Sequence, residues 1–277
     1  MRDLPETYTL LDADFISKLY ITQNLSDEHL IDKVISLPYN FCCHYQIFDE
    51  LKRHHGSAST WLESQISNAS VKMFDDFDIL QLIENALGSK PFVFYLSFLK
   101  EICDDFNRDT YKNYYSHLEN NDILSLTTEN FIDELVNADT SLGVASNLGD
   151  FKNYVLARTI SFVEVARLII IMSDDKKCRN ATYTLLNANS IDCLGISCLG
   201  FFELIKQKSL FTREQAKEFF DTWMAFHQNS NQTHFRVVDS LSSSPSGNFI
   251  KIEGFTLFKK IYDGETELLR NGFIRLK

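Results

Sequence analysis

Along the chain, short apolar runs alternate with segments in which apolar residues recur at helical spacing, and this alternation predicts strands followed by helices. An apolar run at 8–11 is followed by apolar residues at helical spacing from Phe15 to Tyr20. Residues 41–45 predict a second short buried strand, and 47–53 the helix after it. The most strand-like segment is 167–172. The pattern therefore predicts strand–helix units.

The same order continues on either side of this last strand. A helix is predicted from Phe151 to about residue 164, and another from about Lys177 to Leu186. A short strand at 192–196 follows, and then helices at 199–207 and 213–227. Strands separated by helices indicate a parallel sheet covered on both faces, so the predicted fold class is α/β.

Two segments depart from this order. From residue 57 to 145 apolar positions recur at three- and four-residue spacing, which predicts an all-helical insertion. Beyond Gln228, short alternating runs at 235–238, 249–252, 255–258 and 273–276 predict a small C-terminal appendage with a few strands. The predicted division is a core of residues 1–56 and 146–227, an insertion of 57–145 and an appendage of 228–277.

Composition narrows the class of protein. The chain has 277 residues, of which 44% are hydrophobic, and its 23 Phe and 11 Tyr predict a core rich in aromatic rings. A formal net charge of −11 disfavours loose adhesion to nucleic acid or to an anionic membrane. No long apolar run or export signal is visible, so we expect a cytoplasmic protein without membrane contact. Six scattered cysteines predict buried free thiols.

Acidic residues lie where the predicted strands end or where crossover helices begin. Carboxyl ends of parallel strands meet at one edge of a sheet, so these acids are expected close together. Clustered carboxylates select Mg²⁺ or Mn²⁺, ions that suit phosphoryl chemistry. Helix capping or solvent exposure explains each acid taken singly, and only their joint placement predicts a metal site. The acids are Asp12, Asp14, Glu50, Asp150, Asp174 and Asp175.

Several of these segments resemble PIN-domain ribonucleases. Leu10–Ile16 resembles the opening strand of the family, and Phe48–Leu51 its second-strand segment with an acidic residue before Leu. Leu148-Gly149-Asp150 is similar to the family's Gly-acid helix start, although Glu is commoner there than Asp. Most specific is Ile169–Ala181 followed by Leu194–Gly200, which resembles the last two strand–helix units of toxin-type members. The resemblance covers neither the insertion nor the appendage.

This resemblance implies a PIN-like endoribonuclease that hydrolyses RNA phosphodiester bonds with Mg²⁺ or Mn²⁺. Asp174 is expected as an additional metal ligand, while Asp14 and Ser173 would assist the ligands. The implied catalytic residues and main metal ligands are Asp12, Glu50, Asp150 and Asp175.

Basic residues follow two of the acid positions, where they could contact the phosphates of the substrate. A solvated helix face explains these clusters equally well. The candidate substrate-binding residues are Lys52, Arg53, Lys176, Lys177 and Arg179.

The partners expected are an RNA substrate and an inhibitory, antitoxin-like protein, because toxin-type relatives belong to toxin–antitoxin or defence pairs. A homodimer is compatible with the resemblance. Two other classes stay open: a structure-specific DNA nuclease, since fold alone does not decide the substrate, and a non-catalytic PIN-like interaction module.

Overall fold

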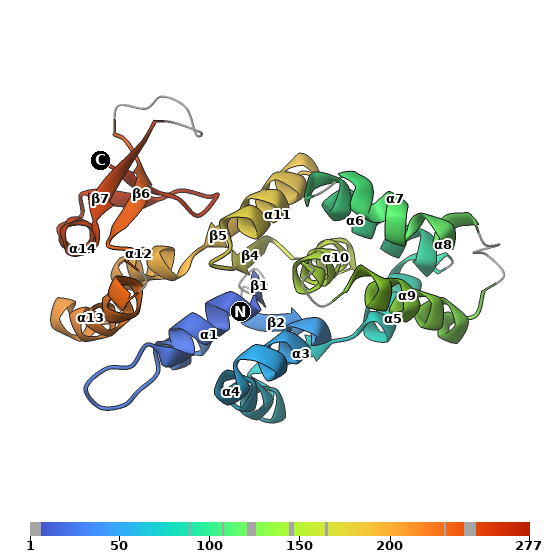
Figure 1. Cartoon of the computed structure of the whole chain (residues 1–277), viewed down its shortest axis with the longest axis horizontal. Helices are drawn as coiled ribbons and strands as arrows, with labels where there is room; N and C mark the ends of the chain where they lie inside the picture. Colours follow the sequence, from blue (N-terminus) through green and yellow to red (C-terminus); the bar gives the residue numbers. More distant parts are fainter. Residues whose placement is uncertain are drawn as a thin grey trace, which may run out of the picture.

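The structure is a computed structural model in which a parallel sheet lies between two groups of helices (Figure 1). It describes residues 7–88, 90–106, 108–120, 126–143, 147–163, 166–229, 231–240 and 248–277. The central sheet has five strands in the order β3-β2-β1-β4-β5, and all of its pairings are parallel. The predicted α/β class with a helix-flanked parallel sheet is therefore confirmed. The strands are β1 (Thr7–Leu11), β2 (Asn40–His44), β3 (Val71–Phe74), β4 (Leu168–Met172) and β5 (Cys193–Ile196).

Successive residues of each strand point to opposite faces of the sheet, and each face has its own hydrophobic core. Leu11 and Cys43 belong to one core, whereas their neighbours Leu10 and Cys42 belong to the other. Helices with buried residues in the first core are α1 (Ala13–Ile21), α2 (Leu30–Ile35), α3 (Tyr45–His54), α4 (Gly56–Ser67), α12 (Cys198–Lys208), α13 (Arg213–Asn229) and α14 (Gly254–Tyr262). Those in the second are α5 (Asp76–Leu87), α6 (Pro91–Phe106), α7 (Arg108–Tyr114), α8 (Ser116–Asn120), α9 (Thr128–Leu142), α10 (Leu148–Val163) and α11 (Lys176–Ala188).

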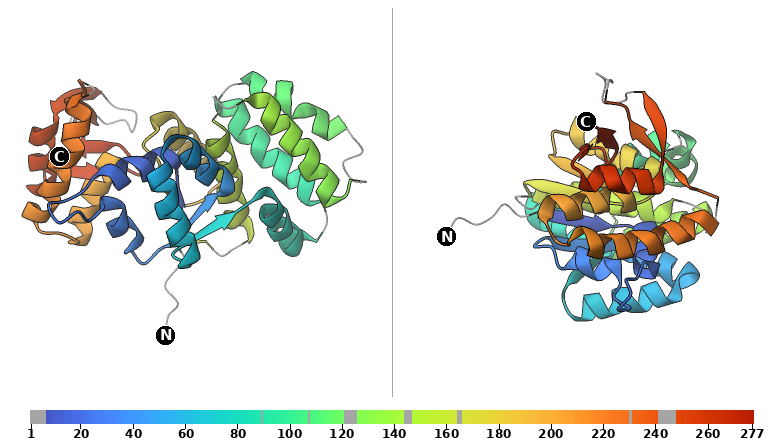
Figure 2. Two further views of the ribbon diagram at one scale, coloured as in Figure 1. Left: turned by 60° about the horizontal axis from the view of Figure 1, so that its bottom comes forward. Right: turned by 90° about the vertical axis from the view of Figure 1, so that its left-hand side faces the viewer.

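The expectation that residues 57–145 are all helical is wrong, because this segment contains β3. Residues Val71–Phe74 form the edge strand of the central sheet and pair with β2. With only four residues, of which Val71 and Phe74 are buried, the strand is too short to interrupt the helical pattern visibly. Helices α5 to α9 gather at one end of the molecule (Figure 2). The division of the chain into core, insertion and appendage stays a prediction.

A second sheet forms the C-terminal part, at the opposite end from α5–α9 (Figure 2). Its order is β7-β6-β9-β8; β6, β7 and β9 coincide with runs expected to be strands in the appendage, whereas β8 was not expected. Residues 255–258 are helical instead of extended, because the Glu253 carboxylate accepts hydrogen bonds from Phe255 N and Thr256 N and caps α14. The elements are β6 (His234–Val238), β7 (Phe249–Glu253), α14 (Gly254–Tyr262), β8 (Thr266–Leu268) and β9 (Ile274–Leu276).

Two compositional expectations can be compared with the fold. All six cysteines are buried and free, as predicted. Within the described ranges, none of the helices combines the length and the apolar character needed to cross a membrane.

Candidate functional site

The connections of the central sheet create a crevice at the carboxyl ends of β1 and β4. From β1 the chain goes outward to β2 and β3, and it then returns past β1 to β4 and β5. In open α/β sheets, ligands bind at such a switch point. Asp12 directly follows β1, and Ser173, Asp174 and Asp175 directly follow β4. Four of the predicted residues therefore lie where this topology places a ligand site.

Asp12 does not cap the helix that it precedes. It is the N-cap residue of α1, but its side chain makes no hydrogen bond to that helix. Instead, its Oδ2 accepts a hydrogen bond from Ser173 Oγ at 2.8 Å, and the residue is only 7% exposed. The capping alternative therefore does not apply to Asp12, and Ser173 orients its carboxylate.

Asn153 fixes α10 over the ends of β1 and β2. Its Nδ2 donates to Leu11 O, and its Oδ1 accepts from His44 N, both at 2.9 Å. Asp150 lies one helical turn earlier on the same face of α10. Asp12, Asp150 and Asn153 line a cavity of about 10 Å³, near the smallest volume that holds one water molecule. The sequence pattern does not single out Asn153, and its spacing from Asp150 is the one signal that could have found it.

Burial and mutual repulsion make Asp12 and Asp150 difficult to ionise. Burial raises the pKa of Asp12 well above its usual value, and repulsion from Asp150 raises it further. Burial and repulsion from Asp175 and Glu50 raise the pKa of Asp150 to about 7, although a hydrogen bond from Cys178 acts against this. In the described part of the chain, no Lys or Arg forms a salt bridge with Asp12, Glu50 or Asp150. A bound cation would relieve this repulsion.

Glu50 reaches the same region from α3. Its Oε1 accepts a hydrogen bond from Gly149 N at 3.0 Å. A Cβ atom at position 149 would lie 2.7 Å from Oε1, so a residue larger than glycine would displace the carboxylate. Burial raises the pKa of Glu50, and the N–H of Gly149 acts against this rise. The glycine before Asp150 thus allows the close approach of Glu50 to the start of α10.

Asp175 caps the N-terminus of α11, which is the common structural role of an acid that follows a strand. Its Oδ1 accepts hydrogen bonds from Lys177 N at 2.5 Å and from Cys178 N at 3.0 Å at the start of α11. Repulsion from Asp175 nevertheless contributes to the raised pKa of Asp150, so the two carboxylates belong to one electrostatic cluster.

Asp174 forms an ion pair with a lysine of the same chain, Lys18. Lys18 Nζ lies 2.7 Å from Asp174 Oδ2 and 2.8 Å from Asp14 Oδ2. Burial alone would raise the pKa of Asp174, but Lys18 and a hydrogen bond from Cys198 N lower it. Lys18 is another residue that the sequence reasoning missed, although its spacing of four from Asp14 on α1 is an ion-pair signal.

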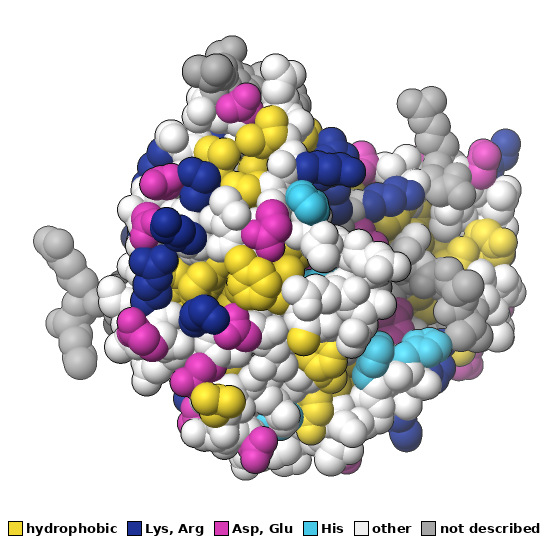
Figure 3. All heavy atoms as spheres, turned by 60° about the vertical axis from the view of Figure 1, so that its left-hand side comes forward, with side chains coloured by type: hydrophobic (Ala, Val, Ile, Leu, Met, Phe, Trp, Pro, Cys, Tyr) yellow, Lys and Arg dark blue, Asp and Glu magenta, His cyan; other side chains and the backbone are white. Residues whose placement is uncertain are grey.

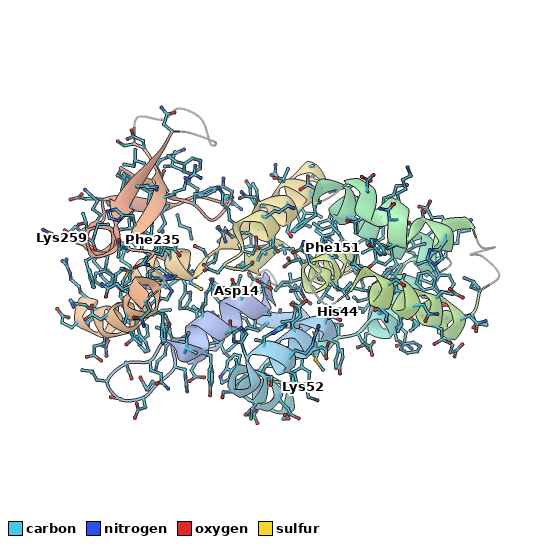
Figure 4. The ribbon with its side chains drawn as sticks, viewed as in Figure 1. Asp14, His44, Lys52, Phe151, Phe235 and Lys259 are labelled. Atoms are coloured by element: carbon cyan, nitrogen blue, oxygen red, sulfur yellow. The ribbon has the colours of Figure 1, made fainter. Side chains whose placement is uncertain are left out.

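The two predicted basic residues on α3 lie in its last turn, and both are exposed. Arg53 NH2 forms an ion pair with Asp49 at 3.0 Å, and Lys52 forms no salt bridge with any described residue. In Figure 4, Asp14 and His44 lie near the middle of the view, whereas Lys52 lies towards its lower edge. Arg53 also lines a cavity together with Glu50 and lowers the pKa of that carboxylate, so the substrate-binding role of Lys52 and Arg53 stays a prediction beside the solvated-face alternative.

The basic residues of α11 have three different environments. Lys177 Nζ donates to Phe106 O at 2.9 Å, which joins α11 to α6. Arg179 is 4% exposed, and its NH1 donates to Ser173 O at 2.6 Å. Lys176 is exposed and lines a cavity together with Arg179 and Asp174.

A buried ionic network lies beside the carboxylate cluster, and no sequence pattern pointed to it. Lys152 Nζ on α10 lies 3.0 Å from Asp76 Oδ2 and 2.8 Å from Asp139 Oδ2. It also donates to Tyr95 OH at 2.9 Å, and Tyr95 OH donates to Asp76. His44 Nε2 lies 3.3 Å from Asp76 Oδ1. The network joins α10 to α5, α6 and α9.

The donor chemistry fits a hard cation in part. Asp12 and Asp150 supply carboxylate oxygens around one cavity, the ligand type that Mg²⁺ and Mn²⁺ prefer. In the described ranges, no three His, Cys, Asp or Glu side chains form a group that could hold a metal ion. One oxygen of Glu50 and one of Asp175 accept hydrogen bonds from backbone N–H groups, of Gly149 and of the start of α11 respectively. The metal site stays a prediction.

Comparison with protein-family models, with curated proteins and with solved structures found no match to this chain.

Proposed function

We propose that this protein is a PIN-like endoribonuclease that depends on Mg²⁺ or Mn²⁺. The observation that carries the proposal is the pair of Asp12 and Asp150, which share a buried cavity and form no salt bridge with a Lys or Arg of the described ranges. The cavity lies beside the end of β1, where it meets β4 at the switch point of a parallel sheet. Buried like charges destabilise a fold, and acids with strongly shifted pKa values at the edge of a sheet are typical of functional sites.

In this proposal Asp12 and Asp150 hold the metal ion, and Glu50 and Asp175 complete the ligand set. The ion, when bound, supplies charge stabilisation for the phosphoryl group and activation of water. Ser173 keeps the Asp12 carboxylate oriented through its hydrogen bond. We assign the ligand role to Asp175 and not to Asp174, since Lys18 already neutralises Asp174.

Cleavage of labelled RNA and DNA of the same sequence, in the presence of Mn²⁺, tests the activity. We expect the wild type to cut RNA, and Asp12→Asn and Glu50→Gln to lose at least about 100-fold of that activity. Asp49→Asn is the matched control, because Asp49 precedes Glu50 but is 41% exposed and paired with Arg53. It should retain the activity of the wild type.

Three results would overturn the proposal. Cleavage of DNA alone would indicate a structure-specific DNA nuclease. Absence of both cleavage and Mn²⁺ binding in the wild type would indicate a non-catalytic interaction module. Equal cleavage by Asp12→Asn and the wild type would place the chemistry elsewhere in the molecule.

The toxin-type role and the inhibitory, antitoxin-like partner rest on the resemblance of the sequence alone, as does a homodimer. If the protein is such a toxin, expression of the wild type should arrest the growth of a bacterial host, whereas Asp12→Asn should be harmless. Equal growth of the two cultures would contradict the toxin role without affecting the cleavage assay.

A further inference from the structure

A cavity of about 520 Å³ lies between the central sheet and the C-terminal part of the chain. It begins at Lys18 and Asp174, beside the candidate site, and reaches β6 and β7. Figure 3 shows Lys and Arg side chains gathered beside a His on the face that carries the C-terminal sheet. We call this cavity the basic groove and define it by Lys176, Arg179, Arg236 and Lys251.

Two cations face each other directly in the C-terminal sheet. Arg236 on β6 is paired in register with Lys251 on β7, and both residues are exposed. Like charges at directly opposite positions destabilise an antiparallel pair. The next pair on the same face, His234 and Glu253, avoids this conflict. Neither Arg236 nor Lys251 forms a salt bridge with any described residue, so no ion pair within the described ranges offsets their mutual repulsion.

Lys176 brings a third cation to the same place. Its Nζ lies 5.4 Å from the ring centre of Phe249 and 5.2 Å from that of Phe273. The Arg236 guanidinium lies 4.5 Å from the same Phe249 ring. Aromatic rings thus hold the cations together, and an anion between them would relieve their repulsion.

Arg179 connects the basic groove to the candidate site. Its NH1 donates to the carbonyl of Ser173, whose hydroxyl group donates to Asp12. The Nε of this buried residue has no hydrogen-bond partner in the described part of the chain. A strand of negative charge in the groove would therefore lie next to the end of β4 and to the carboxylate cluster.

We propose that the basic groove binds the sugar–phosphate backbone of a single RNA strand beside the cleavage site. The C-terminal sheet then forms part of the substrate-binding surface. The inference rests on the proposed function for the identity of the ligand as RNA. A protein with a net charge of −11 repels a polyanion over most of its surface, so binding needs a local cluster of cations. Grooves of this kind follow the backbone of single strands.

The test uses the full chain with Asp12→Asn to prevent cleavage, and fluorescence anisotropy of a fluorescein-labelled polyuridine strand of about twelve nucleotides. Arg236→Glu is the test variant. The variant loses the contact of Arg236 with the Phe249 ring, but its new carboxylate faces Lys251, so the two effects should offset each other and the thermal stability should change little. Lys259→Glu is the matched control, with the same change of charge on the exposed face of α14. Figure 4 shows Lys259 at the outer edge of the C-terminal part, away from Phe235 in the groove.

We expect Arg236→Glu to weaken RNA binding about ten-fold or more, and Lys259→Glu to leave it within about two-fold. The slope of log K against log salt should become shallower by about 0.7 for each phosphate that the variant no longer neutralises. Equal affinities of the two variants would overturn the inference. It would also be overturned if polyglutamate displaced the labelled strand as well as unlabelled RNA does, since the groove would then be a general surface for acidic partners.

These outcomes are separate from those of the nuclease proposal. If the wild type cleaves RNA and both variants bind it equally, the nuclease proposal is retained and the proposal of RNA binding in the groove is overturned. If RNA binding depends on Arg236 but the wild type does not cleave RNA, the proposal of RNA binding in the groove is retained and the nuclease proposal is overturned.

Discussion

Replacement of Lys152 by Met should strongly destabilise the protein. Lys152 is 1% exposed and forms two ion pairs, at 3.0 Å with Asp76 and at 2.8 Å with Asp139. Methionine retains most of the apolar stem but removes the charge, which leaves two carboxylates that are each 14% exposed without their cation. Loss of one partner from a buried ion pair costs about 3–5 kcal/mol, so we expect a loss of this size at pH 7.

The pH dependence distinguishes this loss from a simple packing defect. Burial alone would raise the pKa of Asp76, but Lys152 and His44 hold it well below the usual range. The wild type therefore has the full stabilisation above the unfolded-state pKa of about 4 and loses it only as pH falls towards the depressed folded-state value. In Lys152→Met the charge of Lys152 no longer offsets the burial of Asp76, so the pKa of Asp76 should rise. Partial protonation of Asp76 at pH 5 should then make the deficit smaller than at pH 7.

Urea unfolding at pH 7 and pH 5 measures both effects. Lys100→Met is the matched control in the neighbouring α6, where Lys100 is 49% exposed and 3.7 Å from Glu119. An exposed pair of this kind contributes at most about 1 kcal/mol. Adding Asp139→Asn to Lys152→Met should recover part of the loss, because one unpaired charge is removed. A loss below about 1 kcal/mol in Lys152→Met, or the same loss at both pH values, would refute this reasoning.

Three further outcomes follow from the carboxylate cluster. Asp12→Asn should stabilise the metal-free protein by roughly 1–2 kcal/mol at pH 8, because folding raises the pKa of Asp12. This gain should shrink towards pH 5, where protonation of Asp12 in the wild type relieves the same repulsion. Thermal unfolding at both pH values measures the gain. Ser173→Ala should reduce RNA cleavage about 10- to 100-fold with a small change in melting temperature, since it removes the hydrogen bond that orients Asp12; activity equal to that of the wild type would contradict this. Gly149→Ala should displace Glu50 and weaken Mn²⁺ binding while the fold persists, and unchanged affinity in calorimetry would show that the position of Glu50 is unimportant.

The sequence predicted the elements that have a clear period. The runs that end at Leu11 and Met172 form the neighbouring strands β1 and β4, and the acids directly after them lie at the switch point. These predictions succeed because strand period and the geometry of parallel sheets are local or general properties. The short edge strand β3 was missed, since its pairing with β2 depends on the neighbouring strand more than on its own pattern.

The side-chain partners of the site could not be predicted in the same way. Asn153 contacts β1 and β2 across more than one hundred residues of sequence, and Lys18 reaches Asp174 across a similar distance. The Lys152 network likewise depends on how α5, α6 and α9 pack against α10. Such contacts follow from tertiary packing, and no spacing within one segment encodes them.

The central claim is that acids from separate segments share one hard cation. Calorimetric titration of Mn²⁺ into the wild type, Asp12→Asn and Asp49→Asn tests it most directly. We predict that the wild type and Asp49→Asn bind Mn²⁺, with an affinity that increases from pH 6 to pH 8 as Asp150, whose pKa is about 7, loses its proton. Asp12→Asn should not bind. No binding by the wild type at pH 8, or equal binding by Asp12→Asn, would contradict the claim.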